Sequence, residues 1–253
     1  MGEQDDRTTL KKLIDMDEFK NSSFITDKTE SLVFDQRTLE SIYKIFKDFD
    51  IRSLDYPISS GKESLVYKAI GQKKSYVMKI FKTSTLRFHN IRPYIEGDPR
   101  FAHFRKTGGN IVQIWVRKEY ANLLECEDHG INAPKPLGIN RNVLLMSYIG
   151  TERSPAPKLK DVEEEKREAY LADAMMQYGK LVREAGIIHA DLSEYNILCH
   201  RNKSYLIDMG QAVSKKHPMA REFMARDLQI MKAYSEKNGI KFRDEWITKL
   251  EEN

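Results

Sequence analysis

The chain has 253 residues, with 42 Lys and Arg against 38 Asp and Glu, so its formal net charge is +4. With 40% hydrophobic and 32% charged residues, the composition is typical of a globular domain and excludes a disordered chain. The sequence contains no apolar run of the roughly 18 residues that a membrane-spanning helix needs, and its N-terminal residues lack the apolar stretch of a secretory signal. Two cysteines, Cys126 and Cys199, are too few for a disulfide framework or a four-ligand zinc site. We therefore expect a cytoplasmic protein without membrane attachment.

The beginning of the chain is expected to be helical. Apolar residues with a period near 3.6 predict helix within residues 8–50, with a shorter helix at residues 10–19 and a cap at Asp35 or Thr38. Residues 1–55 are therefore expected to form a helical extension.

The pattern changes at Pro57. A β-prone stretch, the turn-like residues 71–74 and a second β-prone stretch at residues 76–81 follow it. Together they predict an antiparallel hairpin over residues 57–81.

Residues 83–110 show no sustained helical or strand period, and such an irregular insert is typical of a functional or mobile segment. Its net charge is +3, with aromatic residues interleaved. This mixture fits docking on RNA, and it equally fits a loop that orders over a nucleotide or over its own sheet. The charged residues counted are Arg87, Arg92, Arg100, Arg105 and Lys106 against Glu96 and Asp98.

The rest of the chain alternates short strands with long helices. We expect helices at residues 111–128, 161–185, 217–238 and 242–251, with Gly186 closing the second, and short strands at 137–139, 143–148, within 187–200 and at 204–207. Strands with one helix, then a connector, then mainly helices predict an α+β fold of two lobes with a cleft between them.

The segment from His189 to Asn196 has the spacing of a phosphotransferase catalytic loop. Asp191 is followed five residues later by Asn196, inside an H-x-D-L pattern. An Asp in this place accepts or orients the proton of an attacking hydroxyl, and the Asn turns back towards a metal that bridges phosphates.

A second acidic element follows. Asp208-Met209-Gly210 comes twelve residues after Asn196 and directly after the apolar residues 205–207. A strand that delivers an Asp into a cleft before a Gly turn is typical of a metal-binding D-F-G element, here with Met in place of Phe. Asn196 and Asp208 supply the oxygen ligands that Mg²⁺ prefers.

Lys79 lies in the strand-like run Val77-Met78-Lys79-Ile80. Alternation along a strand directs Lys79 towards the cleft while Met78 and Ile80 face the other side. A buried ammonium needs a partner, and Glu119 on the following helix is the predicted one.

The predicted phosphate-covering loop precedes this strand. It has one glycine, and its backbone N–H groups and small hydroxyls suit phosphate contacts. The residues are Ser60, Gly61, Lys62, Glu63 and Ser64.

With these residues placed, the sequence resembles the RIO-family atypical protein kinases, and within them the RIO1 subfamily. The resemblance extends from about Tyr56 to Tyr234. It rests on the loop at residues 60–67, the K-I-F-K-T-S stretch at 79–84, the catalytic loop at 189–196, and the I-D-M-G-Q and H-P-M-A-x-E-F elements at 207–211 and 217–223.

The resemblance implies a two-lobed protein-kinase-like fold. It divides the chain into a helical extension (1–55), an N-lobe (56–148) with a flexible insert (83–110), and a reduced C-lobe (149–253). Only 43 residues follow Gly210 and no A-P-E element occurs among them, so a full peptide-docking platform is not expected.

The resemblance also implies roles for single residues. Asp191 would be the catalytic base, Asn196 and Asp208 the ligands of Mg²⁺ (or Mn²⁺), and Asp208 also a phosphoryl acceptor. Lys79, paired with Glu119, would contact the phosphates of ATP, and backbone groups near Ser147 and Ile149 would contact adenine. Ser193 stands where many protein kinases carry a catalytic-loop lysine.

The implied function is that of an ATP- and Mg²⁺-dependent serine/threonine protein kinase with ATPase activity. It would act on a protein serine, including its own, during maturation of the small ribosomal subunit, and its partners would be pre-ribosomal RNA and protein. One alternative is a nucleotide-switched ribosome-assembly factor with little kinase turnover. Another is a small-molecule phosphotransferase, which the Ser-Glu-Tyr filling of the catalytic loop argues against.

Overall fold

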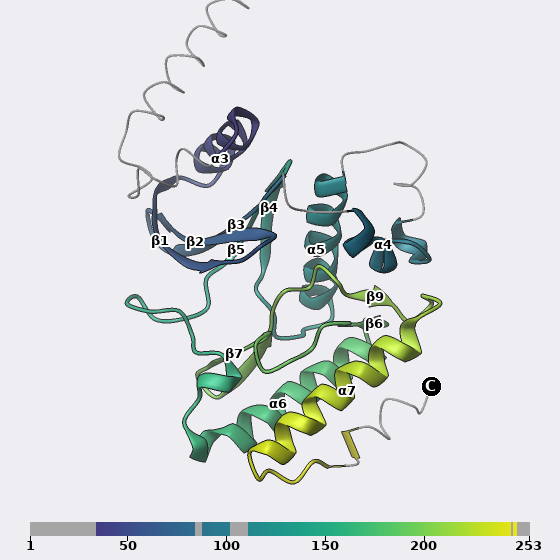
Figure 1. The fold of residues 1–253 in the computed structure, drawn as a ribbon. Helices are drawn as coiled ribbons and strands as arrows, with labels where there is room; N and C mark the ends of the chain where they lie inside the picture. Colours follow the sequence, from purple (N-terminus) through teal and green to yellow (C-terminus); the bar gives the residue numbers. More distant parts are fainter. Residues whose placement is uncertain (1–33, 84–87, 102–110, 244, 247–253) are drawn as a thin grey trace, which may run out of the picture.

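The structure, a computed structural model, describes residues 34–83, 88–101, 111–243 and 245–246. Its elements form an upper lobe around a sheet and a lower, mainly helical lobe (Figure 1). The helix expected at residues 10–19 and most of the one expected at 242–251 lie outside the described residues. Within the described part of the chain, no helix combines the length and the apolar character that crossing a membrane requires.

The upper lobe is built on one antiparallel sheet. The strand order is β1-β2-β3-β5-β4, so the hairpin β4–β5 completes a sheet begun by the first three strands. The strands are β1 (Ile51–Ser60), β2 (Ser64–Gly71), β3 (Ser75–Phe81), β4 (Pro136–Asn140) and β5 (Val143–Ser147).

The predicted hairpin is confirmed as β2–β3, but the first strand begins earlier than expected. β1 starts at Ile51, so the expected boundary at residue 55 falls inside a strand of the sheet. Its register with β2 shifts on both sides of Pro57. An edge strand tolerates proline because its outer N–H groups have no ladder partner, and this irregular pairing concealed β1 from the alternation pattern.

Helix α3 (Gln36–Asp48) covers one face of the sheet. Asp35 caps it, as predicted, and its side chain accepts from the Thr38 N–H at 2.7 Å. The predicted alternation along β3 is also confirmed, since Met78 and Ile80 pack into the core beneath α3. Lys79 therefore faces the opposite side.

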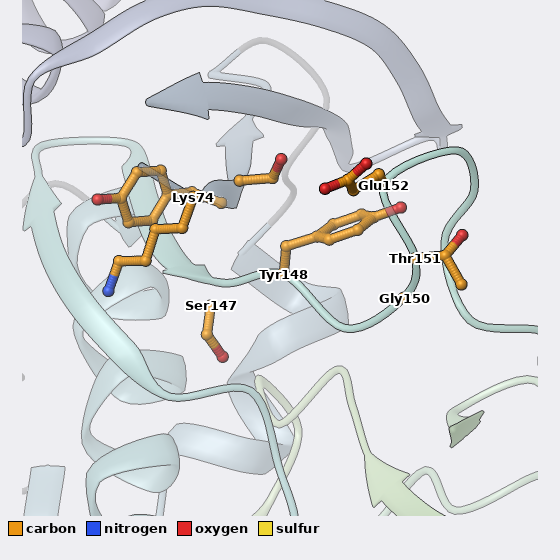
Figure 2. A pocket seen from close by; sticks show the side chains of 8 residues that line it. Lys74, Ser147, Tyr148, Gly150, Thr151 and Glu152 are labelled. Carbon is orange, nitrogen blue, oxygen red and sulfur yellow. The ribbon is translucent and has the colours of Figure 1, made fainter. Parts of the chain in front are cut away.

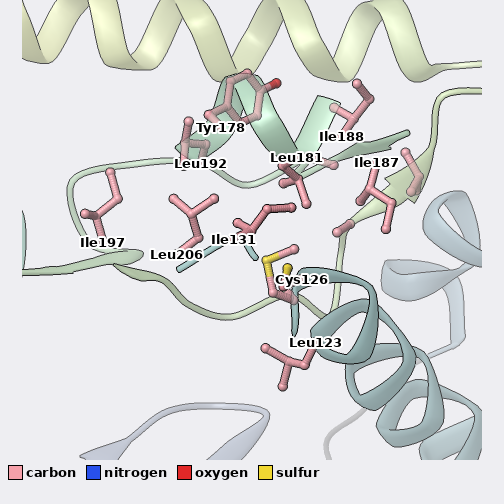
Figure 3. Packing of buried hydrophobic residues seen from close by; sticks show 14 of the residues in the cluster. Leu123, Cys126, Ile131, Tyr178, Leu181, Ile187, Ile188, Leu192, Ile197 and Leu206 are labelled. Atoms are coloured by element: carbon pink, nitrogen blue, oxygen red, sulfur yellow. The ribbon is translucent and has the colours of Figure 1, made fainter. Parts of the chain in front are cut away.

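Helix α5 (Ile111–Asp128) has the bounds predicted for it and connects the two lobes. Leu123 and Cys126 near its end pack with Tyr178 and Leu181 in the core of the lower lobe (Figure 3). The helix is thereby fixed to the lower lobe while it also contacts β4 and β5.

The expectation that the insert has no regular structure is wrong for residues 88–101. They form α4 (Phe88–Ile95) and the short 3-10 helix η1 (Pro99–Phe101). Pro93 inside α4 and Gly97 after it hid the helical period. Gly97 has φ +89, and a Cβ there would lie 2.6 Å from the Pro218 ring, so a tight approach to the lower lobe requires glycine.

The lower lobe consists of two long helices and two small strand pairs. The expected helix at 161–185 begins later because a 3-10 turn precedes it, and Gly186 with φ +65 follows its end, as predicted. The elements are η2 (Leu159–Asp161), α6 (Glu164–Arg183), β6 (Ile187–Ile188) paired with β9 (Val213–Ser214), β7 (Ile197–His200) paired with β8 (Lys203–Leu206), and α7 (Ala220–Lys237).

A buried polar network joins the insert and α5 to the lower lobe. Asp98 accepts from the Arg100 guanidinium at 2.7 Å and from the Ser214 N–H at 3.1 Å. The Ala212 carbonyl accepts from the Lys118 ammonium and, at 3.0 Å, from the Asn122 amide. Burial lowers the pKa of Lys118 to about 7, and the nearby charge of Arg100 adds to this effect. Lys118 therefore loses its proton far more readily than an exposed lysine does.

The depressed pKa of Lys118 predicts a pH dependence of stability. Between pH 7 and 10.5 the unfolded chain binds more protons at this site than the folded chain, so the site makes the free energy of unfolding rise with pH across that window. We expect Lys118→Met to remove this part of the rise. Across that window, the difference in the free energy of unfolding between variant and wild type should change by more than ~1 kcal/mol. The reason is that a tenfold change in proton affinity corresponds to about 1.4 kcal/mol. Urea unfolding at several pH values measures it, and parallel pH profiles of the two proteins would contradict the assignment.

Candidate active site

A cavity of about 570 Å³ lies between the two lobes. Most of the site residues predicted from the sequence line it, namely Gly61, Lys62, Glu63, Ser64, Lys79, Glu119, Ser147, Ile149, Asn196 and Asp208. Ser60 and Asp191 do not belong to the lining. Ser60 ends β1 with an exposed side chain, and Asp191 lies behind Asn196, which it contacts.

Lys79 joins the two lobes at the base of this cavity. Its ammonium lies 2.8 Å from both carboxylate oxygens of Glu119, the predicted partner, and 2.7 Å from Oδ1 of Asp208. Burial alone would lower the pKa of Lys79, but the charges of Asp208 and Glu119 outweigh it and raise that pKa. Burial raises the pKa of Glu119. The lysine therefore remains an ammonium and holds strand β3, helix α5 and Asp208 together.

Asp208 is held in an unfavourable backbone conformation at the cavity wall. Its φ is +63, which non-glycine residues seldom adopt, while its side chain is 51% exposed towards the cavity. The charge of Lys79 keeps its pKa below the usual value, so the group is a carboxylate. Met209 is completely buried, and a Cβ on Gly210 would lie 3.3 Å from Glu119 and from Trp115. Core packing on one side and a close approach on the other fix the aspartate.

The catalytic-loop candidates contact one another. The amide nitrogen of Asn196 donates to Oδ2 of Asp191 at 3.1 Å and to the Asp191 backbone carbonyl at 2.8 Å. Asn196 itself lines the cavity, and the hydrogen bonds to Asp191 use only its side-chain nitrogen. Gln211, which the sequence analysis did not select as a site residue, also donates to Oδ2 of Asp191, at 3.4 Å. Burial raises the pKa of Asp191, and the charge of Asp208 adds to the effect, which suits a group that exchanges a proton.

The loop is anchored from two sides. His189, the first residue of the loop, has Nε2 3.0 Å from the Ile207 carbonyl. The second anchor, Asp227 on α7, was not predicted. This completely buried carboxylate accepts from the N–H groups of Ala190 at 2.8 Å and Leu192 at 3.0 Å. Ala190 has φ +64, and these bonds hold it there.

The turn between β1 and β2 covers one side of the cavity. The Gly61 N–H donates to the Ser64 carbonyl at 2.9 Å, and the Lys82 N–H donates to the Glu63 carbonyl at 2.8 Å. The Lys82 ammonium reaches the Gly61 carbonyl at 2.8 Å. The turn is therefore tied to the end of β3, close to Lys79.

The cavity also has apolar walls that the sequence analysis missed. They come from both lobes and consist of Val66, Val77, Met146, Leu198 and Ile207. Apolar walls beside the segment that connects the lobes suit a flat heteroaromatic ring. The only signal for them was alternation, since Val77 lies two positions before Lys79 on the same strand.

A smaller cavity of about 280 Å³ lies on another side of the connecting segment. Lys74, Tyr148 and Glu152 are among its lining residues (Figure 2). Ser147 is the only predicted site residue in its lining, so this cavity is not the candidate active site.

The residues present suit a metal held jointly with a ligand. Within the described ranges, no three His, Cys, Asp or Glu side chains are grouped so that they alone could hold an ion. Asn196 and Asp208 offer an amide and a carboxylate oxygen, which match Mg²⁺ when phosphate and water oxygens complete its shell.

The Asp227 anchor can be tested by mutation. In Asp227→Asn one acceptor oxygen is replaced by a donor, so at least one N–H group of the loop loses its bond. We expect a loss of about 1–3 kcal/mol in the free energy of unfolding, with faster hydrogen exchange at the amides of Ala190 and Leu192. Tyr178→Phe is the control, because it removes only the hydroxyl that donates to the same carboxylate at 3.1 Å. Unchanged exchange at both amides in Asp227→Asn would show that Asp227 does not hold the loop.

Comparison with known proteins agrees with this geometry. A family model described as the RIO domain matches residues 65–247. The RIO-type serine/threonine-protein kinase Rio1 of Thermoplasma acidophilum is 48% identical over 176 residues, which cover 70% of this chain and 92% of that protein. Its namesake from Haloferax volcanii is 38% identical over 238 residues, which cover 92% of this chain and 81% of that protein.

The fold is similar to that of the Rio2 kinase from Chaetomium thermophilum. One crystal structure aligns with a TM-score of 0.64 at 22% identity, over 85% of this chain and 67% of that one. Another, the complex of this kinase described as ADP/Mg²⁺-phosphoaspartate, aligns with a TM-score of 0.61 at 21% identity, over 85% and 66%. The likeness establishes the two-lobed kinase fold. Together with the domain match and the sequence identities, it leads to one conclusion: the chain belongs to the RIO family of serine/threonine protein kinases, in its RIO1 subfamily.

Proposed function

We propose that this kinase uses ATP and Mg²⁺ to phosphorylate a protein serine, including one of its own, and that it also hydrolyses ATP. The observation that carries this proposal is the contact of Lys79 with both Glu119 and Asp208 at the base of the cavity. This ammonium at the base of a cavity with apolar walls supports the proposal, since it offers a positive charge to the phosphates of a nucleotide.

Each predicted residue has a proposed task. Lys79, positioned by Glu119, binds phosphate oxygens, and the turn with Gly61, Lys62, Glu63 and Ser64, extended by Ser60, covers them. Backbone groups of Ser147 and Ile149 bind the base. Asp191 accepts the proton of the attacking hydroxyl, and its raised pKa suits that task. Bound Mg²⁺, or Mn²⁺ in its place, would neutralise phosphate charge, with Asn196 and Asp208 as its protein ligands.

Asp208 is also the proposed phosphoryl acceptor of the ATPase route. Its carboxylate attacks the terminal phosphorus, the bond to ADP breaks, and an acyl phosphate forms that water then hydrolyses to phosphate and free carboxylate. The exposure of this carboxylate and its lowered pKa support the proposal, since the attacking group must be accessible and deprotonated. The phosphoaspartate named for the Chaetomium Rio2 complex adds a precedent.

Two variants test these assignments. Asp191→Ala should lower autophosphorylation at least ~100-fold because the proton acceptor is lost, and Asp208→Ala should abolish both autophosphorylation and ATP hydrolysis. Phosphate carried by Asp208 should be released by hydroxylamine, which cleaves acyl phosphates. Asp128→Ala, at the exposed end of α5, is the matched control. Wild-type turnover in both active-site variants would refute the mechanism.

We further propose that the protein acts in the cytoplasm on a precursor of the small ribosomal subunit, and that the nucleotide state controls its binding there. The basic residues of the insert support an RNA contact. Two of them are already paired with carboxylates, so fewer positive charges are available than the composition suggests. Arg92 pairs with Glu96 at 2.6 Å and Arg100 with Asp98 at 2.7 Å. Once these two pairs are set aside, the formal surplus of +3 is that of Arg87, Arg105 and Lys106, which lie outside the described residues.

This charge assignment predicts which variants weaken RNA binding. Replacing Arg87, Arg105 and Lys106 together by Ala should lower the affinity for precursor RNA of the small subunit. The slope of log affinity against log salt concentration should become shallower, by the equivalent of up to about three lost phosphate contacts. Arg92→Ala is the control, because that side chain is already paired. Filter binding at several salt concentrations, with ATP or ADP and Mg²⁺, measures both effects. Equal salt slopes in the triple variant and wild type would count against the insert, and equal affinities with the two nucleotides would count against a nucleotide switch.

A further inference from the structure

The segment that connects the lobes ends in a lysine whose backbone is fixed. The Pro157 carbonyl accepts from the Cys199 N–H at 2.9 Å, and Lys158 forms an antiparallel bridge with Leu198. Leu159, the next residue, is completely buried. Lys158 is therefore held against strand β7, directly below the cavity, by contacts on both sides of it in the chain.

Three lysines line the cavity, and they reach it from different places. Lys62 lies on the exposed turn between β1 and β2, and Lys79 on β3 is bound to two carboxylates. Lys158 reaches the cavity from the lower lobe, from which Asn196 and Asp208 also line it. Among the residues that the structure describes, no carboxylate forms an ion pair with Lys158, in contrast to Lys160, which lies 2.8 Å from Asp161.

Lys158 lies near the candidate metal ligands. It lines the same cavity as Asn196 and Asp208, and its bridge partner Leu198 follows Asn196 by two residues. Phosphoryl transfer needs positive charge around the phosphate oxygens, because negative charge accumulates there in the transition state. In the catalytic loop of this chain the position where many protein kinases have a lysine is Ser193, which carries no charge.

We propose that Lys158 binds the phosphate chain of the nucleotide from the lower lobe and supplies the positive charge that Ser193 does not. The inference rests on the proposed use of ATP. It assigns to the connector, which joins the lobes, a second task in holding the substrate. Lys160, two residues further on, does not share this task, since it is paired with Asp161 and lies over the ring of Tyr195.

Nucleotide affinities test the proposal without relying on turnover. The dissociation constants of ATP, ADP and adenosine, each with Mg²⁺, are measured by calorimetry for wild type, Lys158→Met, Lys158→Arg and Lys160→Met. We expect Lys158→Met to weaken ATP binding about tenfold, as for one lost charge-assisted contact, and to leave adenosine binding within about twofold. Lys158→Arg should retain most of the affinity for ATP, and Lys160→Met should behave as wild type.

The ligands distinguish the possible outcomes. A loss for ATP alone, or for ATP and ADP, supports a phosphate contact and shows which phosphate is bound. An equal loss for adenosine would overturn the proposal, because the lysine would then act on the nucleoside or on the fold, and so would unchanged ATP binding in Lys158→Met. Lys79→Met is included so that failure of the proposed function can be told apart from failure of the Lys158 proposal. If wild type itself does not bind ATP more tightly than Lys79→Met, the proposed function fails, whereas failure at Lys158 alone leaves that function intact.

Discussion

The ammonium of Lys79 between two carboxylates is the interaction on which the rest of the site depends. An unpaired buried ammonium would cost several kcal/mol, so strand β3 can keep Lys79 buried only if carboxylates approach it. Glu119 comes from α5 and Asp208 from the loop after β8. Satisfying one lysine therefore fixes the sheet, the connecting helix and the catalytic segment relative to one another.

This requirement explains why the segment after Asp208 is held so firmly. A positive φ at Asp208 persists only where the surroundings enforce it. Met209 is buried in the core, and the side-chain amide of Asn122 donates to the Met209 carbonyl at 2.7 Å. Lys118 and Asn122 then hold the carbonyl of Ala212. One helix, α5, thus supplies both the partner of Lys79 and the contacts that stabilise the strained loop.

The local patterns were predictable and the long-range supports were not. Lys79, Asp191, Asn196 and Asp208 stand in short strands and loops where their spacing alone limits their geometry. Asp227 is an ordinary helix position 36 residues beyond Asp191, and nothing in its neighbourhood marks it as an acceptor for loop N–H groups. Irregular pairing hid the start of the edge strand β1. Pro93 and Gly97 hid the short helix α4. Both elements depend on tertiary contacts, which leave no regular pattern in the local sequence.

Contacts from α7 and from the insert explain how the loop at residues 189–196 keeps its shape although the connection between β9 and α7 is short. In the described stretch from Asp208 to Ala220, only five residues separate β9 from α7. This leaves no room for the long activation loop with which many kinases order their catalytic residues. Helix α7 packs beneath the loop instead. Asp227 on this helix accepts from two backbone N–H groups of the loop, and Arg226 donates to the Ala190 carbonyl. The α4–η1 segment, tied to Ser214 through Asp98, holds the other side. The order of this loop is thus built into the packing of α7 and of the α4–η1 segment around it.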